Sequence, residues 1–205
     1  MSDVKPPVDH ELPDDLPIAR QRFAVVDVET SGLEPARHRV LQVGCVVVDG
    51  DGTVIDRWSS LVGRGLAVWR TVGPTEVHGI RRRDLWRAPS PRVVLTELAA
   101  RMTGSRFVAH NAPFDMAFLA NEARRAGVEM SFTGALCTLR MSRALDPERT
   151  MSHRLGDLCE RYGIPLVDAH DALADAEAAA ALLPHLLRAH GVQHIGQLAS
   201  LPPAS

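Results

Sequence analysis

No apolar run in this sequence approaches the roughly 20 residues that a membrane-spanning helix needs, so neither a helical membrane protein nor a membrane partner is expected. The opening stretch MSDVKPPVDHELPDDLP is acidic and proline-rich and lacks the apolar segment of a signal peptide. We expect residues 1–20 to be a disordered lead-in. Cysteine is scarce: Cys45, Cys137 and Cys159 stand far apart, and no Cys-x-x-Cys pair is present to hold zinc. Reduced thiols and a cytoplasmic location follow from this pattern.

An excess of charge of one sign is also missing, since the formal net charge is -2 at pH 7. Such a chain has no global field with which to attract a polyanion. If its partner is a nucleic acid, local basic groups or bound metal ions must provide the attraction. The 45% hydrophobic and 23% charged residues are typical of a soluble globular protein.

The remaining residues, 21–205, suit one domain with a single core. Apolar runs predict strands at residues 22–27, 39–48 and 54–62, with the tight turn DGDGT between the second and third. Helices and short strands alternate after them, which predicts an α/β fold with a mixed sheet covered by helices. The expected later elements are strands at 106–109 and 132–137 and helices at 91–101, 112–126, 153–162 and 171–190.

Two acids lie one residue apart at the end of the first predicted strand, in FAVVDVETSGL. Residues two apart on a strand point to the same face, so Asp27 and Glu29 aim their carboxylates at one point. Paired anions away from water repel each other, and a divalent cation such as magnesium or manganese removes that penalty. The alternative is a solvated strand end followed by the turn Thr30-Ser31-Gly32, and this fragment alone does not decide between the two.

A second fragment, HNAPFD at residues 110–115, follows a predicted strand and opens a helix. Pro113 suits the first helical turn because its missing N–H is not needed there. Asp115 would then lie near the positive end of the helix dipole. The alternative is that Asn111 caps the helix and Asp115 merely complements the dipole.

The third fragment is HDALADA at residues 170–176. Residues five apart in a continuous helix differ by about 140° around the axis, so His170 and Asp175 would not share a face. We therefore place His170 on the loop before the helix and Asp175 one turn inside it. A movable histidine beside a rigid acid suits a proton acceptor beside a metal ligand. Asp171 is an alternative ligand, but we assign it to the N-cap.

Together with HGI at residues 78–80, these fragments resemble the signature series of the DEDDh, or DnaQ-like, 3′–5′ exonucleases. This family includes the proofreading epsilon subunit of bacterial DNA polymerase III. The three main motifs occur in the order of the family, and the resemblance spans about residues 22–190. It implies a ribonuclease-H-like mixed five-stranded sheet flanked by helices, with four acids at the ends of its elements.

The resemblance also implies the roles of single residues. Two divalent cations, Mg²⁺ or Mn²⁺, would be held by Asp27, Glu29, Asp115 and Asp175, and His170 would be the general base. Two such ions can stabilise both the attacking and the departing oxygen of an in-line phosphoryl displacement. The substrate contacts that carry over are Thr30, Gly32, Leu33, His78, His110, Asn111 and Phe114. For Phe114 the alternative is a core residue at a helix start, and for His110 a core histidine with internal hydrogen bonds.

Three functions are compared. The leading hypothesis is a metal-dependent exonuclease that releases nucleoside 5′-monophosphates from the 3′ ends of single-stranded or frayed DNA. The second keeps this chemistry and changes the substrate to RNA ends, as in the related ribonuclease T and oligoribonuclease. The third is a catalytically silent nucleic-acid-binding module, whose expected mark would be a missing acid or histidine; none is missing.

Three further features bear on partners. The tail after Gly191 has no room for the polymerase-docking segment of the replicative subunit, so we expect a free-standing exonuclease or one held loosely by a polymerase or sliding clamp. The stretch QLASL at residues 197–201 faintly resembles clamp-binding peptides, but an apolar helical turn packed on the domain is favoured. Trp69 is expected to pack on the domain. A basic run beside HGI, favoured to be a solvated surface rather than a phosphate contact, consists of Arg81, Arg82, Arg83 and Arg87.

Overall fold

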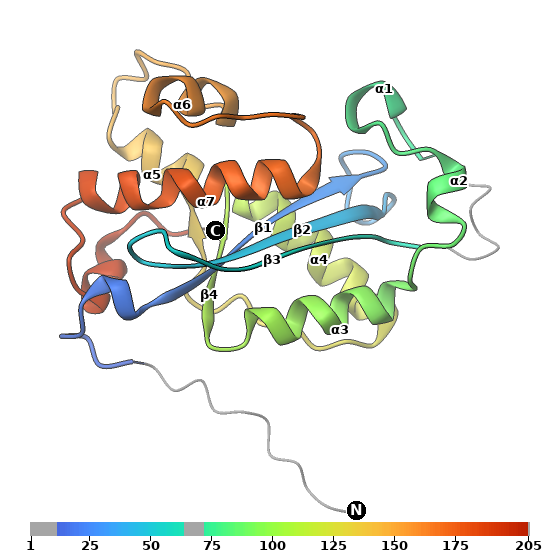
Figure 1. Cartoon of the computed structure of the whole chain (residues 1–205), viewed down its shortest axis with the longest axis horizontal. Helices are drawn as coiled ribbons and strands as arrows, with labels where there is room; N and C mark the ends of the chain where they lie inside the picture. The colour runs from blue at the N-terminus through green and yellow to red at the C-terminus, as the bar shows by residue number, and fades with distance from the viewer. Residues whose placement is uncertain (1–11, 64–71, 205) are drawn as a thin grey trace, which may run out of the picture.

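The sheet of this protein has five strands, as seen in a computed structural model that describes residues 12–63 and 72–204 (Figure 1). The strands lie in the order β3-β2-β1-β4-β5, with β1 antiparallel to β2 and parallel to β4. The predicted mixed five-stranded sheet is therefore confirmed. The strands are β1 (Arg22–Thr30), β2 (Val40–Asp49), β3 (Val54–Leu61), β4 (Ser105–Ala109) and β5 (Leu136–Cys137).

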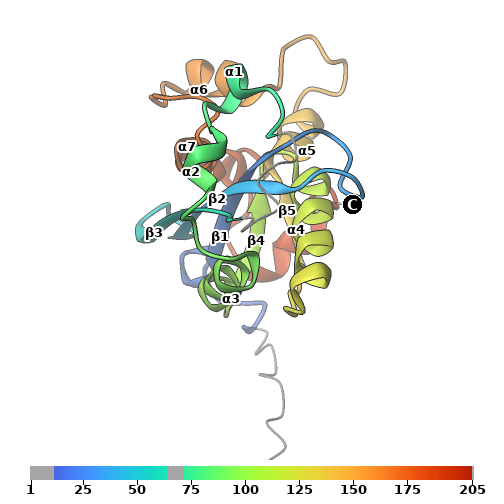
Figure 2. The ribbon, with the colours of Figure 1, turned by 90° about the vertical axis from the view of Figure 1, so that its right-hand side faces the viewer.

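Helices cover both faces of the sheet (Figures 1 and 2). On one face pack α3 (Pro91–Met102) and α4 (Ala112–Ala126). On the other pack α5 (Thr138–Ala144), α6 (Leu155–Tyr162) and α7 (Ala172–Ala189). The short helices α1 (Thr75–His78) and α2 (Arg82–Leu85) follow the gap in the described residues. In the described part of the chain, no helix is both long enough and apolar enough to cross a membrane.

Strand β1 alternates between the two cores, as the pleat requires. Val26 and Val28 are buried with α3 and α4, whereas Phe23 and Val25 are buried with α7. Burial of these side chains stabilises the fold by about 1.5–3 kcal/mol each. By the same alternation, the next two side chains after Phe23 and Val25 on this face are the acids Asp27 and Glu29, which therefore point toward α7.

Within the predicted lead-in, the described residues 12–20 lie against the domain. Residues 18–20 form the 3-10 helix η1 (Ile18–Arg20), and the N–H of Ile18 donates to the carbonyl of Gln193 at 2.8 Å. Leu16 and Ile18 pack against the core beneath α7. These apolar contacts and backbone hydrogen bonds, including those from the N–H groups of Ile195 and Gly196 to the carbonyls of Leu16 and Asp14, hold this segment on the domain. Residues 1–11 lie outside the described part.

The C-terminal segment follows the favoured expectation. Gln197–Leu201 belongs largely to the 3-10 helix η3 (Ile195–Ser200), and Leu198 and Leu201 are buried in the core beneath α7. Its apolar side chains are therefore not displayed for a sliding clamp.

Three local predictions need correction or lie outside the structure. The strand predicted at 132–137 is reduced to β5, because Gly134 turns the chain and the N–H of Ala135 donates to the carbonyl of Phe132. Helix α6 begins two residues later than predicted, after His153. Trp69 lies outside the described residues.

Candidate active site

The end of β1 places Asp27 and Glu29 on the face that packs against α7. In the antiparallel register Asp27 lies opposite Gly44, and Glu29 lies opposite Gln42 on β2. Both carboxyl groups are half-buried, so they are not a fully solvated strand end. The predicted shared face of these acids is present.

Gly44 lets the start of α7 approach the sheet at this point. A Cβ atom at Gly44 would overlap the carbonyl group of Ala172, the first residue of α7. Gln42 fixes the same turn from the neighbouring position, because its side-chain amide donates to the carboxylate of Asp171 at 2.8 Å. Asp171 is the N-cap, as predicted, and accepts hydrogen bonds from the backbone N–H groups of Leu173 and Ala174.

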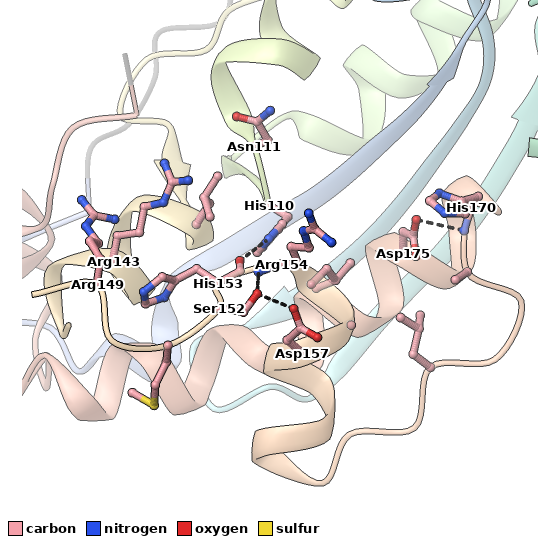
Figure 3. Close-up of a pocket in the computed structure, with 16 residues that line it drawn as sticks. His110, Asn111, Arg143, Arg149, Ser152, His153, Arg154, Asp157, His170 and Asp175 are labelled. Atoms are coloured by element: carbon pink, nitrogen blue, oxygen red, sulfur yellow. Dashed lines mark hydrogen bonds between the residues drawn. The ribbon is translucent and has the colours of Figure 1, made fainter. Parts of the chain in front are cut away.

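The docked start of α7 brings Asp175 to the acids of β1. Single ligand atoms of Glu29, His170 and Asp175 all lie within 4.8 Å of one another. His170 lies on the loop before α7, as expected, and its side chain is exposed. Its backbone φ of 73° falls in the left-handed region, and its N–H donates to the carboxylate of Asp175 at 3.2 Å. Figure 3 shows His170 and Asp175 together at one end of a cleft.

Asp115 reaches the same acids from the other side of β1. The pairing of β1 with β4 ends at Val25 and Val108, so the rest of β1 extends past the end of β4. Helix α4 starts in this space, and Asp115 in its first turn is only 3% exposed. Asp115 is therefore buried toward the acids of β1, and it also lies in the first turn of α4, where it complements the helix dipole as the alternative expected.

The carboxyl groups perturb one another strongly. Burial raises the pKa of Asp27 well above its usual range, and the charges of Asp115, Asp175 and Glu29 raise it further. Burial, followed by the charge of Asp175, raises the pKa of Glu29 to about 8. Burial also raises the pKa of Asp115 to about 8, against opposing backbone hydrogen bonds. Such a cluster is stable in its charged form only with a compensating cation.

The donor set fits a hard divalent cation. Oxygen ligands from Asp27, Glu29, Asp115 and Asp175 are those that magnesium and manganese prefer. The same residues carry the unfavourable repulsion described above, which bound cations would remove.

The last residue of β1, Thr30, and the turn that follows it, with Gly32 and Leu33, come directly after Glu29 in the chain. The Thr30 hydroxyl donates to the carbonyl of Gly32 at 2.8 Å, and Leu33 is 81% exposed. The loop is tied to α4, because Arg39 donates to the buried carboxylate of Glu122 at 2.8 Å. The exposed Leu33 is thus presented from a fixed loop.

His110 forms hydrogen bonds through both ring nitrogens. Nε2 lies 3.0 Å from the carbonyl of His153, which can only accept, so Nε2 carries the proton and Nδ1 accepts from the Thr138 hydroxyl. Burial lowers the pKa of His110 to about 4, so the ring is neutral at physiological pH. This arrangement matches the internally bonded histidine that was the alternative to a substrate contact.

The other predicted substrate-contact residues differ in whether their side chains are free to contact a substrate. Asn111 is the N-cap residue of α4, as the alternative expected, but its side chain is exposed and makes no capping hydrogen bond. Phe114 is half-buried against the core, with its ring centroid 4.7 Å from that of Phe118. His78 is buried and bonded to the backbone of Val72 and Ile80, so its ring is not free to contact a substrate.

A cleft of about 940 Å³ adjoins the acids. It runs from His170 and Asp175 past His110 and Asn111 to the segment that joins α5 to α6 (Figure 3). Asp146 holds that segment in place through several hydrogen bonds. Its carboxylate accepts from the backbone N–H groups of Thr150 and Met151 and is hydrogen-bonded to Nε2 of His153. The cleft therefore has a defined wall opposite the sheet.

Sequence reasoning missed several positioning residues. Gly44 had a signal, because a glycine inside a strand often marks a close backbone approach. Gln42 gave none, since its role depends on the neighbouring strand and on α7. The network of Thr138, Asp146 and His153 likewise joins residues whose spacing in the sequence is not distinctive.

Comparison with known proteins gives a consistent result. The family model RNase_T, described as "Exonuclease", matches residues 24–183. The DNA polymerase III PolC-type proteins of Bacillus cereus and Halalkalibacterium halodurans are 34% and 33% identical over 83% and 84% of this chain. The chain covers only 12% of the length of either relative.

Solved structures share the fold. E. coli exonuclease I in complex with a dT13 oligonucleotide aligns with a TM-score of 0.73 and 21% identity, over 84% of this chain and 42% of that one. Its zinc-bound complex with single-stranded DNA gives 0.72 and 22%, over 82% and 41%. The expected ribonuclease-H-like fold is thus confirmed. Because the family model matches most of the chain, the protein belongs to the DnaQ-like, or ribonuclease T, family of exonucleases.

Proposed function

We propose that this protein is a metal-dependent 3′–5′ exonuclease that hydrolyses phosphodiester bonds at the 3′ ends of single-stranded DNA and releases nucleoside 5′-monophosphates. The observation that carries the proposal is the convergence of Asp27, Glu29, Asp115 and Asp175 from β1, α4 and α7 on one mutually perturbed cluster. The DNA polymerase relatives and the single-stranded DNA in the exonuclease I complexes support DNA as the substrate.

In this proposal the four acids hold two Mg²⁺ or Mn²⁺ ions. When bound, the ions supply charge stabilisation to the attacking and departing oxygens. His170 takes the proton of the attacking water on its imidazole, which is exposed beside Glu29 and Asp175. The turn from Thr30 to Leu33 receives the terminal nucleotide, and Asn111, which lines the cleft, contacts the substrate there.

RNA ends are the alternative substrate, and one experiment separates the two. Matched DNA and RNA oligonucleotides, labelled at the 5′ end, are incubated with the protein and manganese. We expect a ladder that shortens from the 3′ end of the DNA, with mononucleotide 5′-monophosphate as the product. Faster shortening of the RNA would assign the ribonuclease function, and internal cuts would contradict an exonuclease.

Matched variants test the site itself. Asp27→Asn is expected to abolish cleavage while the fold is retained, because loss of one charge relieves repulsion in the metal-free cluster. Asp51→Asn is the control, since Asp51 is exposed in the β2–β3 turn at the other end of the sheet. Wild-type cleavage by Asp27→Asn, or cleavage unaffected by a chelator, would remove the metal site from the mechanism.

We also propose that the protein works alone or in loose association with a polymerase. The PolC-type relatives support a polymerase context, and the buried Leu198 and Leu201 argue against docking of residues 197–201 on a sliding clamp. Sedimentation of the purified chain with and without a PolC-type polymerase would test this. Stable co-sedimentation at nanomolar concentration would contradict a loose association.

A further inference from the structure

The cleft beside the acids has a cationic wall. Three of its lining residues, Arg143, Arg149 and Arg154, come from the end of α5, the connecting segment and the start of α6. All three are exposed. Within residues 12–63 and 72–204 their side chains form no hydrogen bond or ion pair.

Several other arginines of the chain are engaged. Arg39, Arg57 and Arg101 each pair with a carboxylate, and Arg140, a few residues before this wall, donates to the carbonyl of Pro203. The cleft arginines therefore form a local group of available donors in a protein whose net charge is only -2. A group of like charges in a cleft concentrates the field and attracts counter-charge.

The positions of these arginines are set by a folded segment. Asp146 is 7% exposed, and its carboxylate accepts from the N–H of Thr150 at 3.1 Å and of Met151 at 2.9 Å. Arg149 lies inside this turn with a left-handed φ of 57°. The carbonyl of His153, next to Arg154, bonds to His110 beside the acids. The arginine wall is thus connected directly to the motif that carries Asp115.

The arrangement along the cleft has a direction. His170 and Asp175 lie at one end, and in the view of Figure 3 Arg143 and Arg149 lie at the opposite end, with Arg154 between them. Asp157 also lines the cleft, and its carboxylate accepts a hydrogen bond from the Ser152 hydroxyl. Apolar side chains, including Leu139 and Met151, complete the lining.

We propose that Arg143, Arg149 and Arg154 bind the backbone phosphates of a single-stranded nucleic acid on the 5′ side of the bond that is cleaved. This inference rests on the proposed function, which places the 3′ end at the acids. A basic groove that follows the backbone is the usual device for holding single strands. Phosphate contacts carry no base information, so this wall confers affinity without sequence preference.

Binding and cleavage are measured separately, so that the two proposals can fail separately. Fluorescence anisotropy with a 5′-labelled dT12 and a dA12 oligonucleotide, in calcium to suppress turnover, gives Kd as a function of salt. The test variant is Arg143→Gln/Arg149→Gln/Arg154→Gln. The control is Arg92→Gln, an exposed arginine on α3 beneath the other face of the sheet.

Each phosphate contact to a single strand contributes about 0.7 to the slope of log Kd against log salt. We expect the triple variant to lose about 2 from this slope, equally for both oligonucleotides, and the control to lose nothing. The p-nitrophenyl ester of thymidine 5′-monophosphate, which has no strand on the 5′ side, should be cleaved with unchanged kcat/KM. Thermal melting checks the fold, and single Arg149→Glu gives a second test.

Unchanged Kd and salt slope in the triple variant, with ester cleavage intact, would overturn the arginine wall and leave the proposed function standing. The proposal would also be overturned if the triple variant lost as much affinity for a blunt duplex as for the single strands, because the cleft would then not select single strands. If the triple variant loses affinity and salt slope as expected but the wild-type protein cleaves neither substrate, the wall would be retained and the exonuclease refuted.

Discussion

Asp27 lies directly opposite Gly44 in the β1–β2 register, and the absence of a side chain at Gly44 is what allows α7 to contact the sheet beside this acid. The contact of α7 with β2 at Gly44 brings Asp175 close to Asp27 and Glu29, which lie on the neighbouring strand β1. Nothing in the acids themselves provides this approach. A glycine without any ligand atom is therefore part of the construction of the site.

Gly44→Ala is expected to impair both stability and activity. Its Cβ would overlap the carbonyl group of Ala172, so the start of α7 must move outward with Asp175. Overpacking of this kind costs about 1–3 kcal/mol. Chemical denaturation measures the free energy of unfolding, and calorimetry measures manganese affinity. Gly156→Ala is the control, because a Cβ there has no atom within 4 Å. Equal manganese affinity in Gly44→Ala and wild type would contradict the role given to Gly44.

Stability in a chelator is expected to fall as the pH rises from about 5 to about 8. The pKa values of Glu29 and Asp115 in the folded protein are raised to about 8, whereas the unfolded chain loses these protons near pH 4. The folded state therefore holds more protons in this window, and each unit of pH costs stability. Manganese should reverse the loss, since it stabilises the charged carboxylates.

Melting temperatures with EDTA and with manganese, measured across this pH range, check the expectation. A decrease of about 1 kcal/mol corresponds to about 2–4 °C for a chain of this size. Asp27→Asn should show a smaller decrease than wild type, while Asp51→Asn should match wild type. A melting temperature in EDTA that rises steadily to pH 8 would show that the cluster is not the dominant titrating group.

His170→Ala is expected to slow turnover about 10²–10⁴-fold at neutral pH, the usual contribution of a general base. Manganese affinity should change much less, because the four acids remain. Pre-steady-state cleavage and calorimetry provide the two measurements. A collapse of metal affinity instead would make His170 a ligand, which its position within 4.8 Å of Glu29 and Asp175 also permits geometrically.

The features that sequence predicted best were those that depend on local patterns. An apolar run located β1, and the placement of His170 before α7 followed from helix geometry alone. Helix α5 was missed because its seven residues have no capping side chain and depend on burial of Met141. The hydrogen bonds of His110 were similarly unpredictable, since its partners Thr138 and His153 are 28 and 43 residues away in the sequence.

Glu122→Gln tests how the loop that presents Leu33 is held. Glu122 is 1% exposed, and it accepts hydrogen bonds from Arg39 at 2.8 Å and from Arg125 at 3.5 Å. Arg125 also donates to the carbonyls of Pro35 and Ala36, so the buried carboxylate connects this loop to α4. Removing its charge should cost about 1.5–3 kcal/mol, the range for hydrogen bonds to charged groups.

The control for Glu122→Gln is Arg37→Gln in the same loop. The pair of Arg37 with Glu34 is exposed, with 77% and 59% of the side chains accessible, and such surface pairs contribute about 0–1 kcal/mol. Denaturant unfolding should therefore separate the two variants clearly. In kinetics with an oligonucleotide, Glu122→Gln should raise KM more than it lowers kcat, because the turn from Thr30 to Leu33 binds the terminal nucleotide in the proposed complex. If both variants lowered kcat alone, the loop would serve the chemical step, and its proposed role in holding the nucleotide would be wrong.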